Sequence, residues 1–250
     1  MTRAGDRRVA LVTGAGTRVG RSIALELKCA GYDLALHYQS NESGAREVAA
    51  EARAEGLEAR VYQANLEDRT KIRRMLDSVL ADFEALDLLV PNAAIFERIR
   101  FEDIDDSAWD RMLGLNLTSS FTLAHYATAS LISRAGNIVF VTCSSVDSPY
   151  KHHLPYVVSK AGVYQLMRTM AIELAPRVRV NAVAPGTVLP PESMSAADLE
   201  RLRSRIPLQR FGSAPDVARA VRFLAESPFI TGQQIVVDGG RSLARAQDGS

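Results

Sequence analysis

The segment that most restricts the folds open to this chain is VALVTGAGTRVGRSIALEL, which begins at Val9. Its apolar start predicts a buried strand, and Ile23–Leu27 begins an amphipathic helix. Gly14, Gly16 and Gly20 stand between the two. A strand, a glycine-bearing turn and a helix let backbone N–H groups approach a diphosphate, with the helix N-terminus facing the anion. The alternative interpretation of the segment is an ordinary turn punctuated by glycine.

Strand-like apolar runs alternate with longer helical patterns along the rest of the chain. The expected strands are at about Val9–Thr13, Leu34–His37, Ala59–Gln63, Leu86–Pro91, Asn137–Thr142, Val178–Val183 and Gln234–Val237. The expected helices are near Arg18–Ala30, Gly44–Glu55, Arg69–Phe83, Ser107–Ser133, Tyr156–Ala175 and Ala214–Ala225. This alternation predicts an α/β fold in which helices cover both faces of a parallel sheet of about seven strands.

The 250 residues contain no linker, repeat or low-complexity segment, so we expect one domain over residues 1–250. The stretch from Gly186 to Gln209 is richer in proline, serine and charge than its surroundings. A segment of this kind is a candidate lid over a ligand site, and we place it at about 187–209.

Composition excludes several classes of function. The chain has 30 Lys and Arg against 29 Asp and Glu, without a basic run, which argues against nucleic acid as a partner. No apolar stretch reaches the roughly 18 residues of a membrane span, and no signal-peptide core follows the N-terminus. Cys29 and Cys143 offer neither a disulfide framework nor a metal-ligand cluster. We therefore expect a soluble cytoplasmic protein that acts on a small molecule, with no metal, nucleic acid or membrane partner.

In open α/β sheets the ligand sits outside the carboxyl ends of the strands. The segments that follow the expected strands are Thr13–Gly20, His37–Asn41, Asn65–Leu66, Asn92–Phe96, Thr142–Ser145 and Pro185–Gly186. We expect these scattered segments to converge on one crevice.

Tyr156 and Lys160 stand four residues apart in YVVSK, inside an apolar stretch compatible with a helix. Four residues is just over one helical turn, so both side chains leave the same face. An ammonium near a phenol favours the phenolate and lowers a tyrosine pKa that is otherwise about 10. Such a pair can exchange a proton with an alcohol or carbonyl oxygen near neutral pH. By chance, surface helices also carry Tyr and Lys at this spacing.

With these residues together, the chain resembles the short-chain dehydrogenase/reductase family from Val9 to about Leu243. The matching elements are TGAGTRVG at 13–20, NLED at 65–68, PNAA at 91–94, Asn116 in LNLTSS, YVVSK at 156–160, NAVAPG at 181–186 and VDGG at 237–240. The resemblance implies a single Rossmann-type doubly wound sheet. It also implies hydride transfer between a nicotinamide cofactor and a carbonyl, alcohol or C=N group.

Within that family the chain is similar to the pteridine reductases. These enzymes have TGxxxRxG, with an arginine where this chain has Arg18, whereas most family members have a glycine there. The LHYQS ending of the second strand is similar to theirs. Phe96, in NAAIF, stands where they stack an aromatic ring on the pterin, opposite the nicotinamide. The resemblance thus implies a substrate site that includes Phe96, Arg18 and Tyr156.

The resemblance also assigns catalytic roles. Tyr156 would donate the proton during reduction, and Lys160 would lower the Tyr156 pKa and hold the ribose hydroxyls. The counterpart of Asn116 orders a water that feeds the lysine. The family's catalytic serine precedes the tyrosine by 13 residues, which falls on Cys143, a weaker hydrogen-bond donor than a hydroxyl. Ser144 fills this role if the intervening loop is one residue shorter, although the apolar phase of IVFVT favours Cys143.

An acid at the end of the second strand would bond the 2′-hydroxyl of NAD and repel a 2′-phosphate. This chain has no acid there before Glu42, and Arg18 adds a cation that can reach the phosphate, so we expect NADP(H). Asn65 replaces the family's usual Asp beside the adenine, and no Arg lies near Ser40. The expected cofactor-binding residues are Gly14, Arg18, Val19, Gly20, His37, Tyr38, Ser40, Asn65, Leu66, Asn92, Ala93, Lys160, Pro185 and Gly186.

The leading hypothesis is NADPH-dependent reduction of a pterin-like heterocycle. The alternatives are reduction of a 3-oxoacyl thioester or another ketone, or a catalytically weakened sensor of NADP(H). The two long helices Ser107–Ser133 and Tyr156–Ala175 have counterparts that pack between subunits, which implies a homotetramer.

Simpler interpretations remain for single residues. Phe96 can be loop packing, Arg18 a surface cation, and His152 and His153 solvated loop residues.

Overall fold

The computed structural model describes residues 7–146, 148–149, 151–188, 190 and 194–245. Within them, seven strands form one parallel sheet in the order β3-β2-β1-β4-β5-β6-β7. The strands are β1 (Val9–Val12), β2 (Asp33–Tyr38), β3 (Ala59–Gln63), β4 (Leu88–Val90), β5 (Asn137–Val141), β6 (Arg179–Pro185) and β7 (Gln234–Val237). The strand order reverses between β1 and β4, and at such a switch point open α/β sheets bind ligands.

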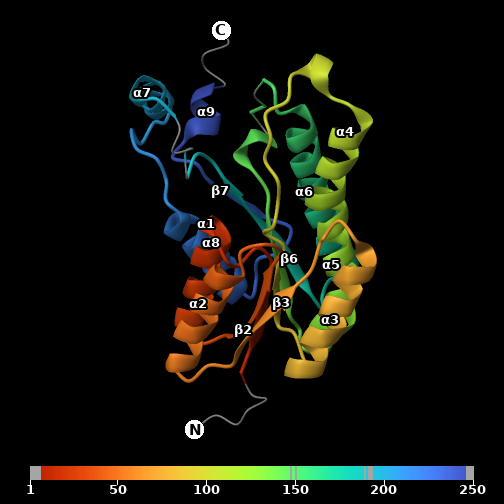
Figure 1. Cartoon of the computed structure of the whole chain (residues 1–250). Coiled ribbons are helices and arrows are strands. Elements are labelled where there is room, and N and C mark those ends of the chain that lie inside the picture. The colour runs from red at the N-terminus through yellow and green to blue at the C-terminus, as the bar shows by residue number, and fades with distance from the viewer. Residues whose placement is uncertain (1–6, 147, 150, 189, 191–193, 246–250) are drawn as a thin grey trace.

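Helices cover both faces of the sheet, as the alternating pattern predicted (Figure 1). They are α1 (Arg18–Cys29), α2 (Glu42–Ala54), α3 (Arg69–Phe83), α4 (Asp106–Leu113), α5 (Ser119–Ser133), α6 (Leu154–Glu173), α7 (Ala196–Ser204), α8 (Ala214–Glu226) and α9 (Arg241–Arg245). Helices α1, α2 and α8 pack on one face, and α3, α5 and α6 on the other.

Two buried cores hold these layers together. Side chains alternate along each strand, so Leu11 and Phe140 join the core under α3, α5 and α6, whereas Val12 and Val139 join the core under α1, α2 and α8. Strands β1, β4 and β5 are buried on both faces, which explains why their residues are apolar apart from Asn137 at the start of β5. The predicted α/β fold with helices on both faces is confirmed.

The helix predicted over Ser107–Ser133 is divided. Helix α4 ends at Leu113, a π-helical turn spans Gly114–Thr118, and α5 begins at Ser119. The N–H of Ser119 bonds the carbonyl of Gly114, five residues back. The Ser119 and Ser120 hydroxyls donate to the carbonyls of Leu115 and Asn116. An apolar period close to 3.6 continues through the turn, so the sequence pattern could not reveal it.

Two strand boundaries also differ from expectation. Strand β4 is shorter than predicted because Leu86 donates its N–H to the Ser130 hydroxyl rather than to a neighbouring strand. Strand β6 extends to Pro185, which pairs with Val237 of β7. The proposed lid contains α7, and part of that segment, Leu189 and residues 191–193, lies outside the described residues. Helix α9 was not predicted.

In the described part of the chain, no helix combines the length and apolar character needed to cross a membrane.

Candidate functional site

The glycine turn after β1 is tightly packed. Gly14 has φ +68°, and a Cβ on Gly20 would stand 2.1 Å from the carbonyl oxygen of Gly14. A Cβ on Gly16 would stand 2.5 Å from the carbonyl oxygen of Asn41. Only glycine fits such close approaches. The turn therefore lets the first turn of α1 lie directly against the ends of β1 and β2.

Hydrogen bonds connect this turn to the neighbouring strand ends. The backbone N–H groups of Asn92 and Ala93 donate to Thr13 Oγ1 at 2.9 and 3.0 Å, and Asn92 Nδ2 donates to the Thr13 carbonyl at 2.9 Å. The Gly14 N–H donates to His37 Nδ1 at 3.1 Å. The ends of β1, β2 and β4 are thus held together around the turn.

The side chain of His37, predicted to bind the cofactor, bonds backbone groups instead. Its side chain is almost fully buried, and its Nε2–H donates to the Ala64 carbonyl at 3.0 Å while Nδ1 accepts from Gly14. Burial lowers the His37 pKa to about 4, so the ring is neutral at physiological pH. His37 touches the cavity described below, but both ring nitrogens serve the backbone. It supports the turn.

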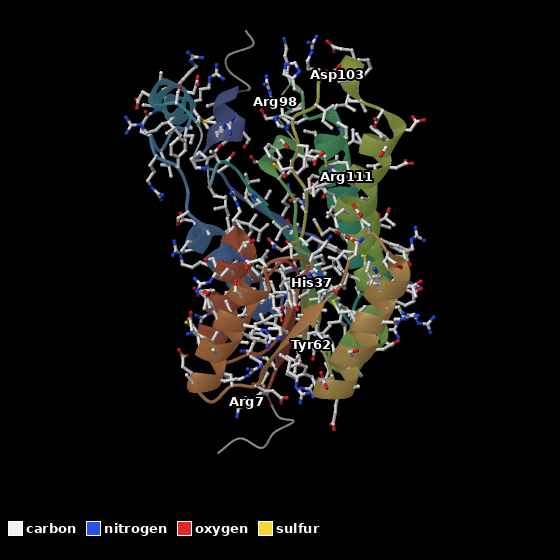
Figure 2. The ribbon with its side chains drawn as sticks, in the orientation of Figure 1. Arg7, His37, Tyr62, Arg98, Asp103 and Arg111 are labelled. Carbon is white, nitrogen blue, oxygen red and sulfur yellow. The ribbon has the colours of Figure 1, made fainter. Side chains whose placement is uncertain are left out.

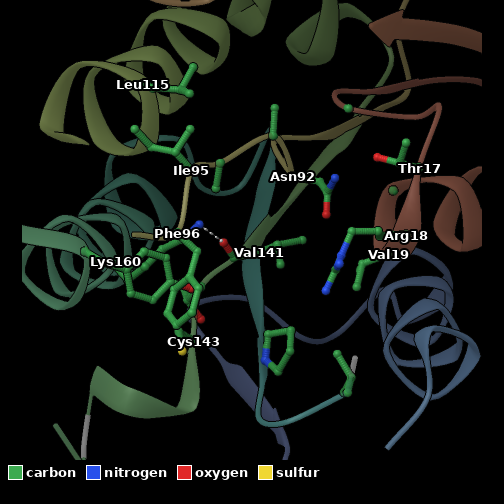
Figure 3. A pocket seen from close by; sticks show the side chains of 18 of the residues that line it. Thr17, Arg18, Val19, Asn92, Ile95, Phe96, Leu115, Val141, Cys143 and Lys160 are labelled. Atoms are coloured by element: carbon green, nitrogen blue, oxygen red, sulfur yellow. Dashed lines mark hydrogen bonds between the residues drawn. The ribbon is translucent and has the colours of Figure 1, made fainter. Parts of the chain in front are cut away.

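A cavity of about 1140 Å³ opens above these strand ends (Figure 3). Sixteen of the predicted site residues line it: Gly14, Arg18, Val19, Gly20, His37, Tyr38, Ser40, Asn92, Ala93, Phe96, Cys143, Ser144, Tyr156, Lys160, Pro185 and Gly186. Figure 3 shows Arg18 and Asn92 on one side of the cavity and Phe96, Cys143 and Lys160 on the other. The predicted convergence is observed for the ends of all the named strands except the segment Asn65–Leu66.

Asn65 and Leu66 are not among the residues that line this cavity. Leu66 is buried in the core on the side of α3, α5 and α6. Asn65 Oδ1 accepts the Glu67 N–H at 3.0 Å, which forms a local turn after β3. Glu67 lines the cavity instead. The prediction of direct contacts from Asn65 and Leu66 is therefore not supported by their positions.

Tyr156 and Lys160 lie on α6 and both line the cavity, as the spacing predicted. Lys160 is 4% exposed, and its Nζ donates to the Val141 carbonyl at 2.8 Å (Figure 3). Burial lowers the Lys160 pKa from 10.5 to about 8, although Cys143 opposes this shift. Lys160 can therefore release or accept a proton close to physiological pH.

Asn116 does not line the cavity. It lies in the π-helical turn, fully buried, where Oδ1 accepts the Ile95 N–H at 2.9 Å. Nδ2 faces the Ile95 carbonyl and Ser159 Oγ, each at 3.0 Å. Its side chain thus joins the loop after β4 to the residue that precedes Lys160. Its side chain therefore has no direct contact with the cavity, and its predicted catalytic role, ordering a water that feeds Lys160, remains a prediction.

The two candidates for the serine position are separated by the structure. Cys143 forms a small buried cluster with Tyr156 and Met112, and its Sγ accepts the Ser145 hydroxyl at 3.1 Å. Ser144 lines the cavity nearer to β6, since a Cβ on Gly186 would stand 3.5 Å from Ser144 Oγ. Cys143 therefore occupies the position beside the tyrosine.

Phe96 and His153 form an aromatic pair that sequence reasoning missed. Their rings stack at 4.5 Å with an interplanar angle of 11°, and the Phe96 ring meets the Tyr156 ring edge-on at 4.7 Å. His153 was interpreted as a solvated loop residue, but it is half-buried in the cavity wall. Its position directly before α6, as the residue that caps the tyrosine's helix, is the signal that could have indicated this.

The charges of the cavity are mostly positive. The lining also includes Arg98, Arg111, Lys151 and Arg241, which were not predicted, and Glu67 is the one carboxylate among the described lining residues. The end of β2 presents no acid, because Glu42 begins α2 and pairs with Arg46. Across the described part of the chain, no three His, Cys, Asp or Glu side chains gather closely enough to hold a metal.

The residues present fit a dinucleotide. The glycine turn exposes the N-terminus of α1, Arg18 stands on the turn with φ +50°, and the cavity extends from there to Tyr156. Backbone N–H groups, the helix dipole and a guanidinium are the partners that a diphosphate and a 2′-phosphate prefer.

Comparison with known proteins agrees with this geometry. A family model described as enoyl-(acyl carrier protein) reductase matches residues 14–242. The 3-oxoacyl-[acyl-carrier-protein] reductase FabG of Staphylococcus aureus (strain Mu50 / ATCC 700699) is 37% identical over 239 residues, which cover 92% of this chain and 96% of the relative.

Solved structures give the same result. A blue fluorescent protein from a metagenomic library in complex with NADPH has a TM-score of 0.89 and 26% identity, covering 96% of this chain and 99% of that chain. FolM alternative dihydrofolate reductase 1 from Brucella suis in complex with NADP has a TM-score of 0.88 and 33% identity, covering 96% and 97%. This protein is therefore an oxidoreductase that belongs to the short-chain dehydrogenase/reductase family.

Proposed function

We propose that the protein reduces the 3-oxo group of an acyl thioester with NADPH. The observation that carries this proposal is that Tyr156 and the buried Lys160 line the same cavity as the glycine turn. The choice of a thioester among carbonyl compounds is supported by FabG of Staphylococcus aureus, which bears the name of a 3-oxoacyl reductase. NADPH is supported by the NADPH and NADP bound in the similar structures and by the acid-free end of β2.

When bound, the cofactor supplies a hydride to the carbonyl carbon. Tyr156 donates its phenolic proton to the carbonyl oxygen, so the ketone becomes a secondary alcohol and NADP⁺ remains. The ammonium of Lys160 stabilises the resulting phenolate, which then regains a proton from solvent. Arg18 and the N-terminus of α1 would hold the phosphates, and Pro185 and Gly186 also line the cavity.

Cys143 stands where the family has its catalytic serine, and the proposed reaction has to proceed without that hydroxyl. A thiol beside Tyr156 is a weaker donor than a hydroxyl, so it polarises a carbonyl less strongly. Proton delivery from Tyr156 then carries a larger share of the catalysis than in a site with a serine.

A second candidate is reduction of a pterin-like heterocycle, which would place the chain near the pteridine reductases. The observation in its favour is the stacked pair of Phe96 and His153 next to Tyr156. Phe96 is 56% exposed although it lines the cavity, so a flat ring can stack there. The similarity to FolM, named an alternative dihydrofolate reductase, supports this candidate.

NADPH oxidation with acetoacetyl thioesters and with dihydrobiopterin compares the two candidates directly. We expect turnover of the thioester, and exclusive turnover of the pterin would instead select the second candidate. Tyr156→Phe should lower kcat by about 10²- to 10⁴-fold while NADPH binding, followed by nicotinamide fluorescence, is retained. The matched control is Tyr164→Phe on the same helix, since Tyr164 does not line the cavity. Turnover that survives in Tyr156→Phe would contradict the proposed proton donor.

A further inference from the structure

Two loops on the substrate side of the cavity are joined to each other. One follows β4 and contains Phe96–Arg100, and the other, Lys151–His153, precedes α6. The Ile99 N–H donates to the His152 carbonyl at 2.7 Å, and His153 Nδ1–H donates to the Glu97 carbonyl at 2.9 Å. With the stacked rings of Phe96 and His153, these bonds fix the position of one loop against the other.

This joining brings two cations to one rim of the cavity. Arg98 lies between Glu97 and Ile99 of the first loop. Lys151 directly precedes the residues of the second loop that bond them. Both side chains are exposed, and both residues line the cavity. Figure 2 shows Arg98 in the upper part of the molecule, at the opposite end from Arg7. Burial lowers the pKa of His153, and the positive charge of Arg98 lowers it further. The guanidinium of Arg98 is therefore close enough to the second loop to act on His153.

No acid in the described part of the chain pairs with either cation. Within the described residues, Arg98 and Lys151 form no ion pair, whereas Arg111 on the same cavity pairs with Glu97, and Arg100 on the same loop pairs with Glu102. Acidic side chains are therefore close, but they are bound to other arginines. Glu67, the one carboxylate among the described lining residues, follows β3 on the cofactor side.

Arg98 and Lys151 are also separate from the cofactor's phosphates. Those phosphates are expected at the glycine turn and Arg18, on the other side of the cavity from Phe96 (Figure 3). Tyr156, where the reaction takes place, contacts Phe96 between these two ends. A pair of cations beyond the reacting position that pairs with no described acid is suited to an anion other than the cofactor's phosphates, such as one carried by the substrate.

We propose that the substrate carries an anionic group, a phosphate or a carboxylate, on the part remote from its reacting carbon, and that Arg98 and Lys151 bind this group at the rim of the cavity. The inference rests on the proposed reductase function, because it takes Tyr156 as the position of the reacting carbon. The anion has two chemical sources. One is the phosphate-bearing arm of a thioester, and the other is the carboxylate of an acidic heterocycle.

Two pairs of compounds test this inference and distinguish the sources. Acetoacetyl-coenzyme A and the acetoacetyl thioester of N-acetylcysteamine share the reacting group, and only the larger one carries phosphate. Dihydrofolate and dihydrobiopterin share the ring, and only dihydrofolate carries carboxylates. The members of each pair also differ in uncharged parts, so the effect of the anion is read from how the variants change the ratio. The quantity measured is the ratio of kcat/KM for the anionic and the neutral member of each pair.

We expect the ratio to exceed one for the pair that matches the natural source. It should fall about tenfold in Arg98→Ala and in Lys151→Ala, the effect of one charge-assisted contact, and fall with added salt. Arg100→Ala is the matched control, because Arg100 is on the same loop but is not among the lining residues and already pairs with Glu102. Its ratio should equal that of the wild type. Equal ratios in the wild type, Arg98→Ala and Lys151→Ala would overturn the inference while leaving the reductase function intact.

A binding measurement covers the case in which none of these compounds is reduced. Calorimetric titration of each anionic compound into protein saturated with NADP⁺ keeps the compound out of the cofactor site. Weaker binding in Arg98→Ala and Lys151→Ala but not in Arg100→Ala supports the anion site, even where the proposed reaction has failed. Identical affinities in all four proteins refute it.

Discussion

Replacing Lys160 by methionine should stabilise the ligand-free protein near neutral pH. In the native protein Lys160 is buried with its Nζ on the Val141 carbonyl, and its pKa falls from 10.5 to about 8. The difference of about 2.5 pH units corresponds to about 3 kcal/mol, which is the cost of keeping the ammonium buried at low pH. Methionine has a similar length and no charge, so it removes this cost.

The dependence on pH gives the sign of the effect. Below pH 8 the native and the unfolded chain both hold the proton on Lys160, and the native state carries the full cost of burial. Between pH 8 and 10.5 the unfolded chain binds more protons than the native one, so the wild type gains stability as pH rises. The advantage of Lys160→Met should therefore be about 3 kcal/mol below pH 8 and decline across this window.

Urea denaturation at equilibrium, in reductant and at several pH values from 7 to about 10, measures this difference. Comparing the variant with the wild type at each pH cancels the titration of other groups. Lys71→Met serves as the control for removing a lysine, because Lys71 is exposed on α3. An advantage of Lys160→Met that is the same at every pH, or absent, would refute the argument from burial.

The remaining predictions concern the cofactor, the thiol and assembly. Gly20→Ala should abolish NADPH binding in a fluorescence titration and lower Tm, because its Cβ would stand 2.1 Å from a carbonyl oxygen. Arg18→Ala should reduce the ratio of kcat/KM with NADPH to that with NADH by about tenfold, and an unchanged ratio would exclude contact with the 2′-phosphate. Cys143→Ala should lower kcat more than Ser144→Ala, and the reverse order would return the catalytic position to the serine. The predicted homotetramer should be visible by light scattering, and Ile172→Glu should dissociate it, since Ile172 is 80% exposed on α6. An Ile172→Glu variant with the same mass as the wild type in light scattering would argue against an interface at this position.

The parts of this fold that could be predicted are those that local sequence determines. Val9–Val12 and the last four residues of Asn137–Val141 are continuous apolar runs because both faces of their strands are buried, and so they stand out in the sequence. The spacing of Tyr156 and Lys160 places them in one cavity because a helix repeats every 3.6 residues.

The parts that could not be predicted depend on pairings between distant segments. His37 bonds Gly14 and Ala64, and nothing near it in the sequence distinguishes a supporting ring from a ligand-binding one. Asn116 turns towards Ile95 because the π-helical turn redirects it, and the apolar period gives no sign of that turn. Arg98 reaches the cavity rim only because its loop is bonded to another one more than fifty residues later.

The π-helical turn between α4 and α5 limits which length changes this gene can accept. Each residue of an α-helix adds about 100° of rotation. The π-helical turn accommodates one extra residue, so the helix that follows keeps its orientation towards the core. Leu123, Ala127 and Leu131 consequently face the core while Phe121 and Tyr126 face outward. Loss of a single codon within Gly114–Thr118 would convert the turn to ordinary α-helix and leave the core-facing row in place, whereas the same loss within Ser119–Ser133 would swing the outward row towards the sheet.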